Sequence, residues 1–440
     1  MWEYYQNKSA LVTGGSGFLG TALVYRLLSR TKTSRVYLLC RDGRKKLEAK
    51  WKKALPHEIA KELCESSRLI VFDGDIVKPD MGLDIPELDA IRHNVHIIIH
   101  AASSINLSKG LPSLMNTVIR ATEKIANFAL TCDHLDRFVY VSTAYANTHL
   151  YHRSEEADVE IKENFYDLEN EITALPEWTE VQKFGTSHFY EEENFPWAYA
   201  YAKNLTERLL LQLFSDEDLS HKLLVVRPSV IGPAQNFPFP GYSVPMSTPL
   251  TIFTAAMIMT PSWTFRSSTR LASPDDEVNI DEVPVDVVVD RLLCHMAFGT
   301  IGCFHAVSGE RARMYFHGWR KTFTQLRNIP WVPHPVWVLQ DWKSPNQHMM
   351  SRLYVILGAS FCFSEHRTVS MSLKLRAEEL VGLQLFASIH PDNRILERID
   401  GIRQVMDMFA SKNWWAFLIV WIFYRNFGKA APGLKQRSSF

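Results

Sequence analysis

Short apolar segments alternate with amphipathic stretches through the first half of the chain. Six of these segments are expected to be strands: Ser9–Thr13, Arg35–Cys40, Leu69–Phe72, Val95–His100, Arg137–Val141 and Lys222–Val226. Stretches with helical periodicity separate them, among them Thr21–Ser29, Asn116–Thr131 and Tyr199–Phe214. The expected strands are apolar on both faces, as strands between two layers of helices are. The pattern therefore predicts an α/β fold with a doubly wound parallel sheet.

Two regions depart from this alternation. The segment from Tyr151 to Pro196 is polar, acidic and helix-prone, and we expect an insertion over 151–196 beside the active site, without a strand of its own. After about residue 300 the alternation stops, although a further helix is expected at Val369–Leu383. We therefore expect a domain over 1–300 that includes the insertion, and a smaller, mostly helical domain over 301–440.

Two apolar runs, Leu353–Phe363 and Trp414–Tyr424, each have 11 residues. A helix needs about 20 residues to cross a membrane, so neither run is expected to do so. Lys412 and Arg425 flank the second run and tryptophans begin it, which suits a segment lying in a membrane interface. A buried helix of the second domain is an equal alternative. Because no basic and apolar leader precedes the first strand, we expect an intracellular protein, cytoplasmic or peripheral on an organelle membrane.

Composition and charge narrow the classes of function. The formal net charge of the 440 residues is +0, so no nucleic-acid partner is expected. The six cysteines are scattered without a C-x-x-C pair, as in a reduced intracellular chain, and no metal site is expected.

A glycine-rich segment, GGSGFLG, follows the first expected strand directly and opens a helix. In this position Gly14 permits a tight turn, Gly17 lets the backbone approach a pyrophosphate, and Gly20 lets the helix pack closely on the strand. The free N–H groups and the dipole at the helix start, where Phe18 and Leu19 stand, favour bound phosphates. We therefore expect a Rossmann-type dinucleotide site at these five residues, with a plain strand-to-helix turn as the alternative.

The end of the second strand discriminates between the two nicotinamide cofactors. An acidic residue there would bind the ribose 2′-hydroxyl of NAD, whereas a cation suits the 2′-phosphate of NADP. Here Arg41 ends the segment, Asp42 stands next to it, and further cations follow at Arg44, Lys45 and Lys46. We therefore expect NADPH with Arg41 at its 2′-phosphate. A solvated basic loop is the alternative.

Two later strand ends are expected to complete the cofactor site. Asp75 and Ile76, after the third strand, fall where the adenine would lie. His100, Ala101 and Ala102 end the fourth strand with small residues, so Ala101 leaves room for cofactor ribose and phosphates.

Tyr199 and Lys203 stand four residues apart in an expected helix, which places a phenol and an ammonium one turn apart on the same face. A cation favours the phenolate, so we expect Lys203 to lower the pKa of Tyr199 from about 10 and to make it a proton donor to a carbonyl. Lys203 would also bond the nicotinamide ribose. Thr143, beside Ser142, follows the fifth strand where open α/β sheets bind ligands, and it can donate to the same carbonyl oxygen.

With these residues in this order, the chain resembles the extended short-chain dehydrogenase/reductase superfamily, and within it the fatty acyl-CoA reductase (male-sterility) family and the related thioester-reductase domains. The resemblance covers residues 9 to about 300. It rests on VTGGSGFLG at 12–20, VYLLCR at 36–41, GDI at 74–76, IIHAASSI at 98–105, VYVSTAYAN at 139–147, YAYAK at 199–203, VVRPSVIGP at 225–233, FPFPGY at 237–242 and NIDEVPVDVVVD at 279–290. The 55 residues between Thr143 and Tyr199 also suit an acyl reductase. The family's usual glycine is missing from the helix at Asn116 to Arg120, and the C-terminal 140 residues match the family only vaguely.

The resemblance implies NADPH-dependent reduction of a long-chain acyl-CoA thioester to the aldehyde and then to the primary alcohol. It implies Thr143, Tyr199 and Lys203 as catalytic residues, and an acyl-CoA or acyl-carrier thioester as the partner. The C-terminal region would supply an acyl groove or a peripheral membrane contact. Three alternatives stay open: a reductase of a carrier- or CoA-bound polyketide or specialised-metabolite acyl group, a sterol or sugar dehydrogenase of the same superfamily, and a non-enzymatic dinucleotide-binding protein.

Overall fold

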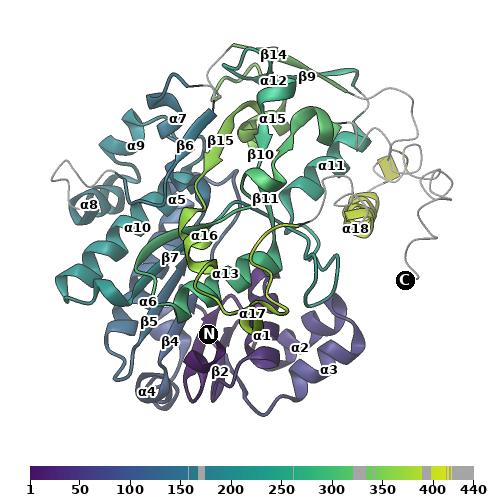
Figure 1. Cartoon of the computed structure of the whole chain (residues 1–440). Helices are drawn as coiled ribbons and strands as arrows, with labels where there is room; N and C mark the ends of the chain where they lie inside the picture. The colour runs from purple at the N-terminus through teal and green to yellow at the C-terminus, as the bar shows by residue number, and fades with distance from the viewer. Residues whose placement is uncertain are drawn as a thin grey trace.

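A seven-stranded parallel sheet runs through the centre of the molecule, in the order β12-β7-β5-β4-β1-β2-β3 (Figure 1). The computed structural model describes residues 1–156, 158–166, 174–260, 262–320, 333–339, 342–388, 398–412, 414, 415 and 418. The strands of the sheet are β1 (Ser9–Thr13), β2 (Arg35–Cys40), β3 (Leu69–Asp73), β4 (Ile97–His100), β5 (Arg137–Val141), β7 (Leu223–Pro228) and β12 (Gly302–Ala306). The six expected strands are all present, and the doubly wound α/β fold is confirmed.

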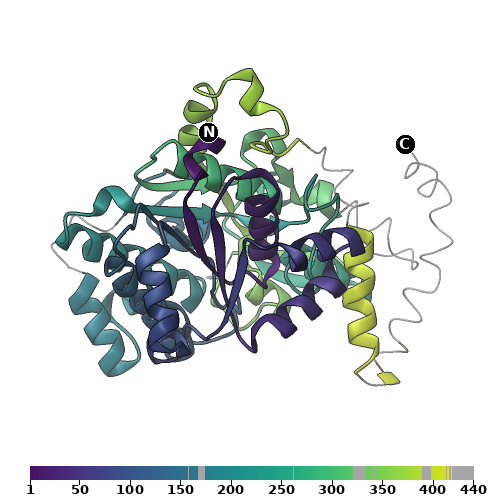
Figure 2. The same cartoon turned by 90° about the horizontal axis from the view of Figure 1, so that it is seen from below.

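Successive residues of β1 belong to two different cores. Val12 packs with α1 and α13 on one face of the sheet, and Leu11 packs with α4, α6 and α10 on the other, so helices cover both faces (Figure 2). These helices and their neighbours are α1 (Phe18–Arg30), α2 (Gly43–Ala54), α3 (His57–Glu65), α4 (Ile85–Asn94), α6 (Ala121–Leu130), α10 (Ala198–Asp216) and α13 (Val285–Ala297). The helix expected at Asn116–Thr131 begins with a π-helical segment, Met115–Arg120, before α6.

The order of the strands reverses at β1, and this reversal places the candidate site. The chain passes from β1 outward to β2 and β3, and then returns to pair β4 with the other edge of β1, where Val12 lies between Leu38 and Ile99. In open α/β sheets the crevice outside the carboxyl ends of the strands, at such a reversal, is where ligands bind.

The insertion contains a strand, so the expectation that it has none is wrong. β6 (Asp158–Ile161) pairs in parallel with β15 (Ser360–Phe363), with Val159 opposite Phe361. Local sequence does not show this strand, because its partner lies near the other end of the chain. In the part of the insertion that the structure describes, the remaining elements are helices: α7 (Leu150–Arg153), α8 (Ala174–Phe184) and α9 (His188–Glu192).

The chain beyond residue 300 is a mostly helical region that also carries strands. β12 belongs to the main sheet, so the sheet extends to Ala306, past the domain boundary expected at 300. The single helix expected at Val369–Leu383 is two short helices, because α16 ends at Ser372 and α17 starts only after Arg376, whose backbone N–H donates to the Glu379 carboxylate at 3.1 Å. Further helices and strands outside the main sheet, among the described residues, are α5 (Leu111–Leu114), β8 (Val230–Gly232), α11 (Pro249–Met259), β9 (Thr264–Ser268), α12 (Pro274–Glu277), β10 (Asn279–Ile280), β11 (Glu282–Pro284), β13 (Met314–Tyr315), β14 (His334–Val338), α15 (Met349–Leu353), α16 (His366–Ser372), α17 (Ala377–Leu380) and α18 (Ile399–Ala410).

The two apolar runs have different outcomes. Leu353–Phe363 forms the end of α15, a short 3₁₀ turn and β15, and most of it lies in the core. Of Trp414–Tyr424, only residues 414, 415 and 418 are described, so the alternative of a buried helix stays outside the described residues. α18, before this run, packs on α11 at the edge of the molecule (Figure 2). Within the described part of the chain, no helix combines the length and the apolar character that crossing a bilayer requires.

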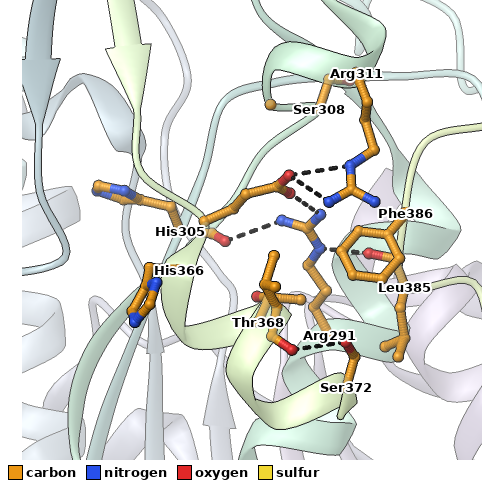
Figure 3. Close-up of polar contacts among 12 residues, drawn as sticks. Arg291, His305, Ser308, Arg311, His366, Thr368, Ser372, Leu385 and Phe386 are labelled. Carbon is orange, nitrogen blue, oxygen red and sulfur yellow. Dashed lines mark hydrogen bonds and ion pairs between the residues drawn. The ribbon is translucent and has the colours of Figure 1, made fainter.

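A buried ion pair fastens the C-terminal region to α13. Arg291 donates to the Glu365 carboxylate at 2.6 Å, and Arg311 donates to the other oxygen of that carboxylate at 3.2 Å. Arg291 also donates to the carbonyl of Leu385, and the Arg311 guanidinium lies 4.0 Å from the centre of the Phe386 ring (Figure 3). Two guanidiniums around one carboxylate satisfy its oxygens, which makes its burial tolerable.

Candidate active site

The glycine loop between β1 and α1 is shaped for close approach. Gly14 has a φ of +76°, which L side chains rarely adopt, and a Cβ there would lie 2.8 Å from the Ala102 nitrogen. A Cβ on Gly20 would lie 2.1 Å from the Gly14 carbonyl oxygen, so only glycine lets α1 pack this closely on the loop. Gly17 precedes α1 without a side-chain cap, which leaves the N–H groups at Phe18 and Leu19 for an anion. The loop therefore fits the pyrophosphate of a dinucleotide.

A hydrogen-bonded relay holds the neighbouring strand end in place. Thr122 donates to the Val118 carbonyl at 2.6 Å, so it can only accept from His100 Nε2, at 3.1 Å. His100 Nδ1 then accepts from Thr13, at 2.7 Å, and the Thr13 hydroxyl accepts from the backbone N–H of Ala102, at 3.2 Å. Burial, with a smaller contribution from Lys203, lowers the pKa of His100 to about 3, so the ring stays neutral. The relay positions Ala101 and Ala102 against the glycine loop.

Arg41 stands at the carboxyl end of β2, as expected. It is exposed, and its guanidinium has no hydrogen bond or ion pair within the described part of the chain. The neighbouring Asp42 is engaged by Lys46, whose hydrogen bond lowers the pKa of the Asp42 carboxyl. Because Lys46 engages Asp42, the Arg41 guanidinium remains available at the strand end.

The sequence reasoning missed Lys50. Its ammonium, on α2, donates to the hydroxyl of Ser16 in the glycine loop at 3.1 Å. Lys50 therefore adds a cation at the place where phosphates are expected. No local signal marks it, because Lys50 is one of several lysines on an exposed helix.

Asp75 and Ile76 lie in the loop after β3, on the same edge of the sheet. Asp75 accepts a hydrogen bond from the Val77 backbone N–H at 3.1 Å, and its own N–H donates to the Met81 carbonyl at 2.7 Å. Ile76 packs partly buried against the adjoining core. The structure thus defines this loop, and the contact of these residues with an adenine stays a prediction.

Tyr199 and Lys203 lie on the first turns of α10, one turn apart. The Lys203 Nζ is 5.9 Å from the centre of the Tyr199 ring and 4.5 Å from that of Tyr140. It donates to the carbonyl of Val141, the last residue of β5, at 2.8 Å. This bond joins the helix that carries Tyr199 to the strand end that carries Thr143.

The expectation that Lys203 lowers the pKa of Tyr199 is wrong. Burial raises the pKa of Tyr199 well above its ordinary value of about 10. Burial also lowers the pKa of Lys203 to about 7, against the opposing influence of the Glu207 carboxylate. Burial thus sets the protonation of both groups, and the tyrosine is a neutral O–H donor.

Thr143 and Ser142 differ in how their hydroxyls are used. Thr143 donates to the Pro228 carbonyl and accepts from the Tyr145 N–H, each at a long 3.3 Å. The hydroxyl oxygen of Ser142 is buried and has no hydrogen-bond partner among the described residues. Thr143 therefore caps the turn after β5, and the weak bond to Pro228 is the one a substrate oxygen would replace.

The expected site residues from five strand ends gather at one edge of the sheet. Strands β1 to β5 pair in parallel, so their carboxyl ends lie at the same edge. In strand order, the groups that follow these ends are the glycine loop, Arg41, Asp75, Ala101 and Thr143. Within the described ranges, no group of three or more His, Cys, Asp or Glu side chains is arranged to hold a metal.

Fold and site together define a short-chain dehydrogenase/reductase of the extended type, with a site for a nicotinamide dinucleotide. The chain belongs to the male sterility protein family, an NAD-binding family whose sequence model matches residues 12–292. The expected family is thereby confirmed.

Two relatives illustrate the likeness. The chain is 27% identical to fatty acyl-CoA reductase 1 of Xenopus laevis over 305 residues, which cover 66% of this chain and 55% of that protein. It is also 27% identical to fatty acyl-CoA reductase 1 of Homo sapiens, over 301 residues that cover the same shares. The chain thus spans about half the length of the curated relatives it matches.

A solved structure supports the fold over nearly the whole chain. The reductase domain of a nonribosomal peptide synthetase from Mycobacterium tuberculosis aligns with 92% of this chain and 93% of its own, with a TM-score of 0.60. The sequence identity is 17%, so this likeness concerns the fold.

Proposed function

We propose that the protein reduces a long-chain acyl-CoA thioester with NADPH, first to the aldehyde and then to the primary alcohol. The observation that carries the proposal is the arrangement of Thr143, Tyr199 and Lys203 beside the glycine loop, at the carboxyl edge of the sheet. The substrate class is inferred from the similar proteins, which are named fatty acyl-CoA reductases.

The side chains of the site have separate roles in this proposal. Thr143 and Tyr199 donate hydrogen bonds to the thioester carbonyl oxygen, where negative charge develops during reduction. Bound NADPH would supply the hydride. The oxyanion collapses with loss of the CoA thiolate, and the aldehyde carbonyl then occupies the same two donors. Tyr199 gives its proton to the alcohol oxygen in the second reduction, since its raised pKa keeps the phenol protonated.

Lys203 is the candidate positioning group for the nicotinamide ribose. An ammonium has three N–H donors, and one of them is used by the Val141 carbonyl. The other two remain for ribose hydroxyls. Arg41 and Lys50 supply positive charge for the 2′-phosphate and the pyrophosphate, which supports NADPH as the cofactor.

We also propose a peripheral membrane contact through the run that begins at Trp414. Trp414 and Trp415 are 63% and 59% exposed, and their rings stack at 3.8 Å. Exposed tryptophans beside Lys412 suit the interface of a bilayer, where the substrate and product would reside. The protein would then work in the cytoplasm or on an organelle membrane.

Product analysis tests the function. The purified protein is incubated with NADPH and acyl-CoAs of graded length, carrier-bound acyl thioesters, sterols and nucleotide sugars, while NADPH loss is followed and products are identified by mass spectrometry. Two NADPH consumed per long-chain acyl-CoA, with a primary alcohol as product, is the expected result. One NADPH per substrate would make the product the aldehyde. Turnover of sterols or sugars, with none of any thioester, would refute the proposal.

A further inference from the structure

A buried chain of hydrogen bonds joins the insertion to both segments that carry the candidate catalytic residues. α8 and α9 of the insertion lie beside α10 (Figure 1). Each member of the chain is 4% exposed or less, and the members are Ser187, Tyr201, Glu177, Arg208, Asn204 and Asn147.

At the insertion end, Tyr201 contacts both helices of the insertion. Its hydroxyl donates to Glu177 of α8 at 2.7 Å, so the Ser187 hydroxyl, 2.6 Å away, is the donor to Tyr201. Ser187 also caps α9 by accepting from the Tyr190 N–H at 3.1 Å. One side chain of α10 thus fixes the positions of α8 and α9 relative to it.

A buried ion pair between Arg208 and Glu177 forms the middle of this hydrogen-bond chain. Arg208 donates to both oxygens of Glu177, at 2.7 and 3.0 Å. Both side chains are buried, and removing either partner would leave an uncompensated charge out of water. Burial and the Glu177 carboxylate both raise the pKa of Tyr201, so its proton stays in the link.

The other end of the chain reaches the active site. Arg208 Nε donates to Asn204 at 2.9 Å, and Asn204 donates to Asn147 at 3.0 Å. Asn204 directly follows Lys203, and Asn147 ends the 3₁₀ turn that Thr143 caps. The final link therefore bridges the helix of Tyr199 and Lys203 to the turn of Thr143.

We infer that Tyr201 and Glu177 are positioning residues. Through them the insertion sets the distance between Thr143 and the helix that carries Tyr199 and Lys203. Tyr201 is two residues from Tyr199 and from Lys203, which at 3.6 residues per turn places it on nearly the opposite side of α10. It acts on the reacting groups only through the helix. The kinetic consequence rests on the proposed function, whereas the structural consequence does not.

The variant Tyr201→Phe keeps the ring and removes the hydroxyl that joins Ser187 to Glu177. Tyr190→Phe is the matched control. The Tyr190 ring, on α9, packs on the Tyr201 ring with 4.6 Å between their centres, and the Tyr190 hydroxyl forms no hydrogen bond with any described residue. For Tyr201→Phe we expect kcat to fall about ten- to a hundredfold, because the reacting groups would be misplaced. KM for the acyl-CoA and Kd for NADPH should stay near wild type. Tyr190→Phe should retain the wild-type kcat, and Glu177→Gln should follow Tyr201→Phe.

Hydrogen–deuterium exchange supplies a readout that needs no substrate. Peptides covering residues 143–148, at the far end of the chain, should exchange faster in Tyr201→Phe than in Tyr190→Phe or the wild type. Unchanged exchange in these peptides would overturn the inference, as would a wild-type kcat in a folded Tyr201→Phe. If the wild type reduced no thioester, the proposed function would fail while the exchange comparison still decided the positioning role.

Discussion

Lys203 donates a hydrogen bond to the carbonyl of Val141 at 2.8 Å, and this contact connects the two segments that carry the candidate catalytic residues. The lysine lies on α10, one turn from Tyr199, and the carbonyl closes β5 just before Thr143. The ammonium is withdrawn from water at this place, which sets its acid–base behaviour as well as its position.

Removal of the Tyr199 hydroxyl tests the proton donor. Tyr199→Phe should lower kcat by about a hundredfold or more, since a positioned general acid contributes roughly 10²- to 10⁴-fold. NADPH affinity, measured by fluorescence titration, should stay unchanged because the ring remains. The nearby Tyr140→Phe variant serves as a control for loss of a phenol from the same cluster. Wild-type turnover in Tyr199→Phe would rule out the catalytic role.

The buried ammonium of Lys203 should make stability depend on pH. Its pKa is about 7 in the folded chain against 10.5 for an ordinary lysine, so between these values the unfolded chain binds the proton and the folded chain does not. The free energy of unfolding should therefore rise from about pH 7 towards pH 10. In Lys203→Met this rise should be smaller. Urea unfolding at pH 7, 8.5 and 10 measures it, and equal pH dependence in both proteins would contradict the lowered pKa.

Arg41 should discriminate between the two cofactors. Arg41→Ala should raise KM for NADPH about ten- to a hundredfold, since a hydrogen bond to a charged group is worth about 1.5–3 kcal/mol, and should leave KM for NADH nearly unchanged. Arg44→Ala is the matched control, because Arg44 is already paired with Glu48. An unchanged ratio of NADPH to NADH use in Arg41→Ala would mean that another residue binds the 2′-phosphate.

Gly20→Ala should damage the dinucleotide loop through contact alone. Its Cβ would lie 2.1 Å from the Gly14 carbonyl oxygen, and a backbone atom cannot turn aside as a side chain can. We expect a loss of about 1–3 kcal/mol in the free energy of unfolding, as overpacking typically costs, together with weaker NADPH binding. Gly110→Ala is the control, since its Cβ would meet only an ordinary contact at 3.8 Å. Equal melting temperatures for the two variants would refute the close-packing role.

The tryptophan pair tests the membrane contact. Replacing Trp414 and Trp415 by serine should lower the partition coefficient onto anionic phospholipid vesicles, measured by flotation, by about a hundredfold or more, because each large apolar side chain removed from water gains about 1.5–3 kcal/mol. Trp263→Ser is the control, since Trp263 is equally exposed, at 63%, and lies outside the run that begins at Trp414. Flotation that is unaffected by the double replacement, or equally affected by Trp263→Ser, would place the contact elsewhere.

Local pattern was sufficient for the main sheet and for the cofactor loop. The six expected strands and the positive φ of Gly14 follow from residues adjacent in the sequence. The insertion strand β6 was missed because Val159 finds its partner at Phe361, which no local window contains. The helix expected at Val369–Leu383 was wrong for another reason: apolar residues continue through the break, whereas a second helix starts after Arg376, whose N–H donates to Glu379.

Sequence by itself determined the parallel sheet, the dinucleotide loop and the one-turn spacing of Tyr199 and Lys203, because strand periodicity, glycine placement and helical spacing act over a few residues. Tertiary structure alone decided the protonation of that pair, because burial depends on what surrounds a side chain, and burial is the main cause of both pKa shifts. It also decided that the insertion is linked to the active site, since Glu177, Tyr201 and Asn147 meet only after the chain has folded.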